Sequence, residues 1–393
     1  MKILHFSDLH LGVKTEGQSR LEEQKEILSE IVDIANAHAV DAVLVCGDVF
    51  QKSVPSADAE DLFFETIERL CDDGKRFVLV VAGNHDDPVR LGAGAHLAKK
   101  HNILIVGDQG VNFKPNNVQA GTSVIECGDG YVKLKKGEET CVIAYLPYPT
   151  RSRLKDVCED LTYGECVEKW ANVGASHFDE QSFNIFASHL YLVGGKYLSG
   201  DKEKEIVLGE AYAVDKVYLP KAHYIALGHL HKTQEIFKNC YYSGAICCSR
   251  FYDKSPNVLI VDGGSDGVKN VTPIALTKAY SLKQLEVCCF DEAMEKLVKV
   301  EDRVWIELVF KQDKPLASFE IRKIKKEFPF VLNIKLVRPE KENKFLKRFV
   351  TKKEISSKEL FENFYEQKKN KKPQKELVEL FLDVLKEGED ETD

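Results

Sequence analysis

The sequence predicts an α/β fold built on a mainly parallel sheet, with polar side chains gathered at the carboxyl ends of its strands. Apolar, β-branched runs alternate with helical patterns over residues 1–110, as in parallel strands joined by right-handed crossovers. The longest such run, residues 77–82, stops at Gly83 and is followed by Asn84, His85 and Asp86. In sheets of this kind, chemistry takes place just beyond the carboxyl ends of the strands.

The first strands and helices follow in regular order. Residues 2–6 form a strand pattern that ends near Asp8 and His10, and the run 42–46 ends at Asp48. Helices are predicted at residues 22–38 and 57–72, because their apolar side chains recur at helical spacing. Parallel pairing then places all three polar strand ends on one rim of the sheet.

The pattern changes after residue 110. Residues 111–150 favour strands, and residues 151–180 read as a charged helical segment. Two further apolar runs, residues 183–188 and 224–228, again end in histidine, at His189 and at His229 and His231. Five strands of the chain therefore terminate in potential metal ligands.

Composition suits a globular protein of two or three domains. The chain has 393 residues, of which 44% are hydrophobic and 30% charged. No apolar run approaches the roughly 18 residues of a membrane span, and Met1 leads directly into the first strand, so we expect a cytoplasmic protein. The 11 cysteines show no zinc-type spacing and are expected to be reduced. A net charge of −8 argues against unaided tight binding to nucleic acid.

The polar residues at the strand ends are best explained together. Any one of them could be a structural histidine or a turn residue, but burying the whole group without a ligand would cost several kcal/mol. Carboxylates, imidazoles and one amide favour hard to borderline divalent ions, and their number suits two ions with one bridging Asp. Two such ions support displacement at phosphorus. The set comprises Asp8, His10, Asp48, Asn84, His85, His189, His229 and His231.

These motifs resemble, in order, the five motifs of the calcineurin-like metallophosphoesterase superfamily. The first 12 residues, the segment 47–50 and the segment 226–234 are also similar to the SbcD family, the nuclease subunits of a bacterial DNA repair exonuclease. The resemblance implies a β-sandwich flanked by helices, with a small α+β cap domain and a C-terminal helical tail. It implies domain limits of 1–275 for the nuclease domain, 276–340 for the cap and 341–393 for the tail.

The resemblance also implies roles for the site residues. Its first divalent ion would be held by Asp8, His10, Asp48 and His231, and its second by Asp48, Asn84, His189 and His229. Mn²⁺ is the expected ion. His85 would remain unligated and face the scissile phosphate, where an imidazolium can stabilise charge or donate a proton. Asp86 could orient His85 or could be a simple turn residue, and Gln51 stands where relatives often carry His or Asp.

Residues 280–337 read as a separate α+β unit. Strand patterns at 282–289, 304–310 and 331–337 alternate with helical patterns at 291–299 and 318–328. By the resemblance this cap positions DNA, and Arg322 and Lys323 are the candidate DNA contacts, alongside Lys325 and Lys326. The alternatives are a generic accessory domain and a solvated charged face.

The tail repeats an amphipathic helical pattern. One apolar stripe contains Leu360, Phe361 and Phe364, and a second, which begins after Pro373, contains Leu377 and Phe381. The resemblance assigns this segment to the coiled coil of an SbcC-type ATPase subunit, and packing on the chain's own cap is the alternative. The sequence has no Gly-rich phosphate loop that ends in Gly-Lys-Ser/Thr, so any ATP dependence would come from a partner.

The resemblance thus implies a Mn²⁺-dependent DNA nuclease that acts as exonuclease and as single-strand or hairpin endonuclease. Its partners would be DNA and the ATPase subunit, and the resemblance implies a homodimer within a heterotetramer. The helix face at Leu62 and Phe63 is a candidate dimer surface. The alternatives are a phosphodiesterase or phosphatase for small molecules and a non-catalytic scaffold for the ATPase.

Overall fold

The computed structural model describes residues 1–108, 113–150, 161–196, 212–247, 256–338, 365, 371–375, 377–378 and 381. The chain divides into two compact units, residues 1–337 and residues 338–393. Within the described part, no helix is long and apolar enough to cross a membrane.

The first sheet has six strands in the order β15-β14-β1-β4-β5-β6. Its strands β1, β4, β5 and β6 are mutually parallel, as predicted, while β14 pairs antiparallel with β1, and β15 antiparallel with β14. The bounds are β1 (Lys2–Phe6), β4 (Ala42–Cys46), β5 (Phe77–Val81), β6 (Ile103–Val106), β14 (Asn257–Gly264) and β15 (Gly267–Ala275).

The second sheet has seven strands in the order β12-β13-β11-β10-β9-β8-β7. Strands β9, β10, β11 and β13 are parallel, and the remaining pairs are antiparallel. The bounds are β7 (Ser123–Gly128), β8 (Tyr131–Lys136), β9 (Glu139–Leu146), β10 (Ser182–His189), β11 (Tyr224–Gly228), β12 (Gln234–Phe237) and β13 (Cys240–Tyr242).

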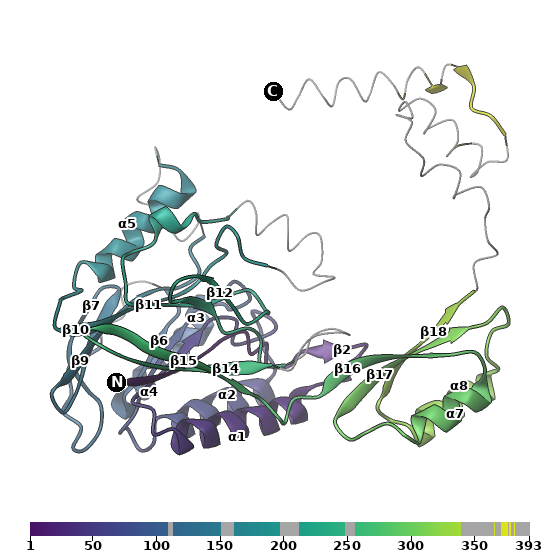
Figure 1. Ribbon diagram of the computed structural model, residues 1–393, viewed down its shortest axis with the longest axis horizontal. Helices are drawn as coiled ribbons and strands as arrows, with labels where there is room; N and C mark the ends of the chain where they lie inside the picture. Colours follow the sequence, from purple (N-terminus) through teal and green to yellow (C-terminus); the bar gives the residue numbers. More distant parts are fainter. Residues whose placement is uncertain are drawn as a thin grey trace. The chain divides into compact units, whose positions relative to one another are not determined.

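The two sheets pack face to face as a β-sandwich. Successive strand residues point to opposite faces, so Ile3 of β1 joins the core between the sheets, with Leu44 and Ile185, whereas Leu4 joins the core beneath the helices. Helices α1 (Leu21–Ala37) and α2 (Ala57–Leu70) lie side by side on the outer face of the first sheet (Figure 1). Helix α5 (Tyr163–Ala175) packs against the second sheet. The predicted helix-flanked sandwich is confirmed.

Helix α2 buries more of its surface than its pattern suggested. Leu62 is 8% exposed and Phe63 0%, because both pack into the core with α1 and the first sheet. The prediction that these two residues form a dimer surface is therefore wrong. Their neighbour Phe64, which is 37% exposed, is the aromatic side chain that this helix leaves accessible.

The predicted cap forms a three-stranded parallel sheet, in the order β16-β17-β18, with a core of its own. Its two helices lie on the same face of that sheet (Figure 1). The name cap is used below for residues 281–337. Its elements are β16 (Ser281–Val287), α7 (Phe290–Leu297), β17 (Val304–Lys311), α8 (Ser318–Glu327) and β18 (Val331–Val337).

Short elements complete the described chain. They are β2 (Lys14–Thr15), β3 (Gln18–Ser19), α3 (Pro88–Leu91), η1 (Gly92–Gly94), α4 (Ala95–Ala98), η2 (Lys99–His101) and η3 (Lys216–Tyr218). Of the predicted helical segment 151–180, residues 151–160 lie outside the described residues. The α5 helix begins after Thr162, whose backbone N–H donates to Glu165 Oε2 (2.8 Å) in a capping box. Cys166 on this helix is disulfide-bonded, so the expectation of reduced cysteines is wrong at that position.

Candidate metal centre

The five polar strand ends meet at one edge of the sandwich. Asp8 and His10 follow β1, Asp48 follows β4, and Asn84 and His85 follow β5. The second sheet supplies His189 at the end of β10, and His229 and His231 after β11. The carboxyl ends of parallel strands from both sheets therefore converge, and this brings together ligands that are up to 223 positions apart in the chain.

The backbone at this edge is held in an unusual conformation. The φ angles of Asp8 (53°), His10 (44°), Asp48 (50°) and His229 (105°) are all positive. Non-glycine residues adopt such angles at a cost of roughly 1–3 kcal/mol each, and they do so mainly at functional sites. Backbone hydrogen bonds keep two of the turns in register, from Asp8 N to Gly47 O (3.0 Å) and from His10 N to Asp48 O (3.0 Å).

Glycines allow the strand ends to approach closely. A Cβ on Gly47, whose φ is 84°, would lie 2.2 Å from His189 Nδ1. A Cβ on Gly83 would lie 2.1 Å from Asp48 Oδ1 and 2.2 Å from Asp48 N. These glycines precede the predicted ligands Asp48 and Asn84 directly, so each is required by packing at the site itself.

A first cluster of ligands contains Asp8, His10 and His231, whose ligand atoms lie within 4.8 Å of one another. His10 Nε2 is 3.1 Å from His231 Nε2 and 3.7 Å from Asp48 Oδ2. Among the described residues, His10 Nδ1 is a buried side-chain nitrogen without a hydrogen-bond partner. Buried carboxylates and neutral imidazoles gathered in this way form a set of donors that suits a divalent cation.

A second cluster surrounds Asn84. Its Oδ1 lies 2.9 Å from His189 Nε2 and 3.0 Å from His229 Nδ1. Asp48 Oδ2 lies 3.5 Å from His189 Nε2, so the Asp48 carboxylate stands between the two clusters. The structure thus brings together all seven predicted metal ligands, and the Asp48 carboxylate lies near a histidine of each cluster.

The orientation of His189 is fixed from the other sheet. Its Nδ1 lies 2.8 Å from the Cys46 carbonyl oxygen. A carbonyl can only accept, so Nδ1 carries the proton and donates, and Nε2 is directed at Asn84 and Asp48. Hydrogen bonds of this kind select the tautomer of metal-binding histidines.

Burial and charge set the protonation of the cluster. Burial lowers the pKa of His10 well below its usual value, and burial with the nearby His189 lowers the pKa of His229. Although burial opposes the imidazolium, the Asp48 carboxylate raises the pKa of His189 to about 9. Burial alone would raise the pKa of Asp48, but His189 beside it holds that pKa well below its usual range. His10 and His229 are therefore neutral, which is the form that ligates a metal.

His85 lies at the rim of the site and is half-buried. Its Nδ1 is 3.1 Å from the Gln51 carbonyl oxygen, so this nitrogen donates and Nε2 is left for another partner. Its ring lies 4.8 Å from that of His10, and its ligand atom falls within 4.8 Å of those of His10 and Asp48. The geometry alone is compatible with either a catalytic or a ligating role.

Asp86 is buried and bonded to backbone groups. Its carboxylate accepts hydrogen bonds from Gly83 N (2.8 Å), Val49 N (3.1 Å) and Phe50 N (2.9 Å). Burial and the neighbouring Asp48 raise the pKa of Asp86 to about 6. These contacts join the loop after β4 to the loop after β5. Asp86 is therefore not the simple turn residue that one interpretation of the sequence allowed.

Sequence reasoning missed three polar residues that support the ligands. Ser7 donates to the Asp8 carboxylate and lies 2.8 Å from Ser243 Oγ, and Gln24 Nε2 donates to the His10 carbonyl (2.9 Å). Ser7 stands next to a ligand in the chain, which could have marked it. Gln24 gave no such signal, because its position in a helical pattern reads as an ordinary surface residue.

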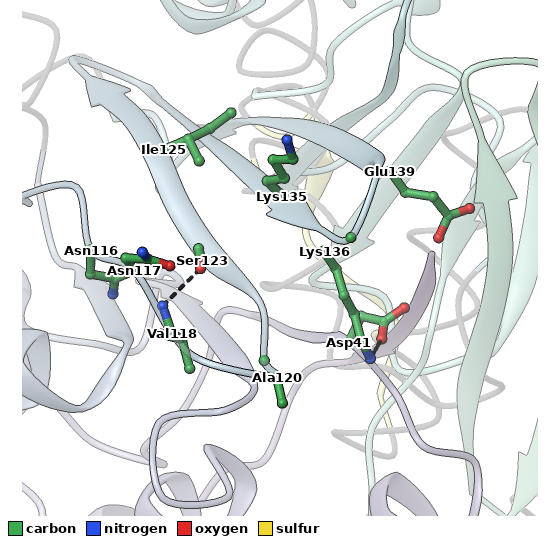
Figure 2. Close-up of a pocket in the computed structure, with 12 residues that line it drawn as sticks. Asp41, Asn116, Asn117, Val118, Ala120, Ser123, Ile125, Lys135, Lys136 and Glu139 are labelled. Carbon is green, nitrogen blue, oxygen red and sulfur yellow. Dashed lines mark hydrogen bonds and ion pairs between the residues drawn. The ribbon is translucent and has the colours of Figure 1, made fainter.

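A separate cavity of about 940 Å³ lies away from these ligands (Figure 2). Its lining includes Asp41, which pairs with Lys136, and Ser123, which accepts from Val118 N (2.8 Å). Asp41 precedes β4 whereas Asp48 follows it, and a five-residue strand spans roughly 17 Å. The cavity is therefore at the opposite edge of the sheet from the chemistry-bearing residues.

Gly83→Ala tests whether this packing holds the ligands in place. The added methyl group has no room beside Asp48, so we expect divalent metal affinity to fall by about 10- to 100-fold, as for other changes in the support of metal ligands. Calorimetric titration with Mn²⁺ measures this. Gly92→Ala is the matched control, because a Cβ there meets nothing within 4 Å and its φ is negative. Equal affinities in the two variants would contradict the prediction.

Comparisons with known proteins agree with this site. The family model for calcineurin-like phosphoesterases matches residues 1–233. The chain is 31% identical over 414 aligned positions to the D subunit of nuclease SbcCD from Bacillus subtilis strain 168, covering 100% of this chain and 99% of the relative. It is 26% identical to the protein of the same name from Staphylococcus epidermidis, covering 77% of this chain and 76% of the relative.

The solved structure of TT1561 from Thermus thermophilus aligns over 70% of this chain and 98% of its own, at 12% identity and a TM-score of 0.35. The matched motifs, the sandwich and the ligand clusters together indicate a centre for divalent metal ions. By its full-length likeness to an SbcD nuclease and its family domain, the chain belongs to the SbcD family of calcineurin-like metallophosphoesterases.

Proposed function

We propose that this protein is the Mn²⁺-dependent nuclease subunit of an ATP-dependent SbcCD-type complex that processes DNA ends and hairpins. It would act as a 3′-5′ exonuclease on duplex DNA and as an endonuclease on single strands and hairpins. The observation that carries the proposal is the convergence of seven ligands and His85 at one edge of a sandwich that belongs to this family. The nuclease domain would comprise residues 1–275, the cap together with its flanking segments residues 276–340, and the tail residues 341–393.

The metal ligands divide into two sets that share Asp48. Asp8, His10 and His231 would complete the first set with Asp48, and Asn84, His189 and His229 the second. When bound, two divalent ions lower the pKa of a water and stabilise charge on the entering and leaving oxygens at phosphorus. Mn²⁺ suits this mixture of carboxylate and imidazole ligands better than Mg²⁺, which prefers oxygen.

His85 would act on the phosphodiester directly. The Gln51 carbonyl fixes its ring through Nδ1, which leaves Nε2 to donate a proton or a hydrogen bond to a phosphate oxygen. Its backbone N–H donates to Asp48 Oδ1 (2.9 Å), so the residue is held to a metal ligand by its backbone and not by its side chain. Asp86 supports this arrangement from beneath, through the loops that it joins.

His85→Ala distinguishes a catalytic role from a ligating one. We expect cleavage of a linear duplex, a hairpin and a single strand to fall by about 10²- to 10⁴-fold, as for loss of a general acid, while calorimetric Mn²⁺ affinity stays within twofold. The exposed His101→Ala is the control. Weakened metal binding would make His85 a ligand. Turnover of a small phosphodiester without DNA cleavage by the unmodified chain would overturn the DNA assignment.

The α8 helix of the cap offers a basic surface for DNA. Arg322 and Lys323 are exposed, and the Lys323 ammonium lies 5.8 Å from the centre of the Phe290 ring. Lys325, which sequence analysis placed with them, donates through Nζ to the carbonyls of Val331 and Leu332 (2.8 and 2.7 Å) and supports the cap instead. We therefore assign the DNA contacts to Arg322 and Lys323.

Replacing both Arg322 and Lys323 by Ala is expected to weaken DNA binding at low salt. If each contacts a phosphate, the slope of log affinity against log salt falls by about 2. Fluorescence anisotropy with a labelled duplex at several salt concentrations measures that slope. Lys299→Ala, which removes an exposed lysine paired with Glu295 on α7, is the control. An unchanged slope would mean that α8 presents only a solvated face.

The tail would bind the coiled coil of the ATPase subunit. Of its proposed contact residues, Leu377 is 36% exposed and Phe381 half-buried, both in helical conformation. Leu360, Phe361 and Phe364 lie outside the described residues. Val378, 5% exposed, is buried within the described part of the chain, so Leu377 presents the more accessible apolar surface. Two copies of the nuclease chain would form a homodimer within a heterotetramer.

Leu377→Asp tests the tail. A charge at the apolar surface is expected to weaken the complex with a coiled-coil fragment of the ATPase subunit by about tenfold or more, near the loss for a buried interface side chain. Surface plasmon resonance with the full-length variant measures this. Lys375→Asp changes charge at a neighbouring exposed position and should have a smaller effect. Equal losses would point to general electrostatics.

A further inference from the structure

A buried ion pair lies at the start of α1. Arg20, directly before the helix, is 1% exposed and Glu23, in its first turn, 4%. Arg20 Nε donates to Glu23 Oε2 (2.5 Å) and Nη2 donates to Oε1 (2.8 Å). A buried, bidentate pair of this kind persists only if the remaining lone pairs of the carboxylate are also used.

Glu23 also accepts hydrogen bonds from the cap, from the segment that leads to it and, through Oε1, from Cys247 Sγ (3.5 Å). Tyr280 N donates to Glu23 Oε1 (2.8 Å), and Trp305 Nε1, from β17, donates to Oε2 (3.1 Å). The Trp305 ring stacks on Tyr280 with centroids 5.2 Å apart, and the Arg20 guanidinium lies 5.9 Å from the ring centre. One carboxylate in the nuclease domain thus fixes the entry to the cap and a strand within it.

The next residue of the same turn holds a metal ligand. Gln24 is fully buried, and its Nε2 donates to the carbonyls of Leu9 and His10, both at 2.9 Å. Its Oε1 accepts from Gly12 N (3.0 Å). These hydrogen bonds of the Gln24 side chain are all made to the backbone of the loop that carries His10.

We propose that the first turn of α1 couples the cap to the metal centre, with Glu23 positioning the cap and Gln24 positioning His10. The two residues are adjacent on one rigid helical turn, so a displacement of the cap that moves Glu23 also moves Gln24 and the His10 loop. Linkage is reciprocal, so metal binding at His10 strengthens docking of the cap, and docking strengthens metal binding. The inference rests on the metal-binding part of the proposed function alone.

Later turns of α1 hold the cap without reaching the metal loop. Glu26 pairs with Arg303 (2.7 Å), and Glu30 accepts from Thr277 N (2.8 Å) and Lys278 N (2.9 Å). Arg303 also lies 5.5 Å from the centre of the Tyr280 ring, so a change there would disturb a partner of Glu23. Glu30→Ala instead removes contacts between α1 and the segment before the cap that lie outside the first turn, and it is the control for changes at Trp305.

The sequence supplies a spectroscopic reporter. The chain has two tryptophans, Trp170 and Trp305. In Trp170→Phe, all tryptophan emission therefore comes from Trp305. In the full-length Trp170→Phe protein, saturating Mn²⁺ should shift the emission maximum of Trp305, because its indole N–H and ring face the Glu23 pair. Adding Gln24→Met, which keeps the side-chain length and removes both polar atoms, should abolish the shift at saturating Mn²⁺.

The reciprocal measurement uses Mn²⁺ affinity. Trp305→Phe keeps an aromatic ring and removes the indole donor to Glu23, and should weaken Mn²⁺ binding by about two- to thirtyfold, as for other residues within a coupling network. Glu30→Ala should leave the affinity unchanged. Trp305→Phe tests the proposal even if Gln24→Met fails to fold, and thermal unfolding verifies the fold of each variant.

Two outcomes would overturn the proposal. In one, Mn²⁺ binding leaves the Trp305 emission maximum unchanged, and Trp305→Phe binds Mn²⁺ as tightly as the unmodified protein. The other is an equal loss of affinity in Trp305→Phe and Glu30→Ala, which would make the effect one of general cap docking. Neither outcome depends on DNA cleavage. If Mn²⁺ binding and cap docking are linked as expected but the protein cleaves no DNA, the coupling stands and the nuclease assignment is rejected.

Discussion

The hydrogen bond from His189 Nδ1 to the Cys46 carbonyl joins the two sheets where the site is built. It links the last residue of β10 to the last residue of β4, and it requires the strands to be very close. A Cβ on Gly228 would lie 1.8 Å from the same carbonyl oxygen, so only glycine is accommodated there. Because the sheets touch at this point, ligands from β4 and β5 can face ligands from β10 and β11. Separated sheets would leave two incomplete half-sites.

This close approach has a cost, which bound divalent ions would offset. Four ligands have positive φ angles, His10 keeps an orphaned ring nitrogen among the described residues, and Asp8 and Asp48 are almost fully buried. The structure compensates in part with backbone contacts, of which the three N–H groups that bond to Asp86 are the clearest. The rest of the compensation is available from divalent cations, which attract both carboxylates and accept the free imidazole lone pairs.

The cap is attached by a different kind of interaction. It has its own apolar core, separate from the core beneath α1 and α2. Its contacts with α1 are made by Glu23, Glu26 and Glu30, which recur at helical spacing and so lie on one face of the helix. The cap therefore folds around its own side chains, whereas polar groups on α1 determine where it sits. An attachment of this kind holds orientation through directional, charge-assisted hydrogen bonds.

The sequence by itself determined the elements and the candidate ligands. Period-2 and period-3.6 patterns located α1 and α2 to within two residues at each end, and abrupt polar strand ends marked the side chains that the structure brings together at one edge. These signals are local, since a strand buried on both faces is apolar wherever it occurs. Leu62 and Phe63 were misassigned because a helical stripe does not say which apolar face meets a partner.

Only the tertiary structure decided how distant segments meet. It placed β1, β4 and β5 in one sheet and β10 and β11 in another, set Asp48 between the two ligand clusters, and gave Gln24 and Glu23 their partners. The reason is physical. The role of a buried glutamine or glutamate depends on the donors and acceptors that packing brings to it. Those lie as far as 282 positions away in the chain.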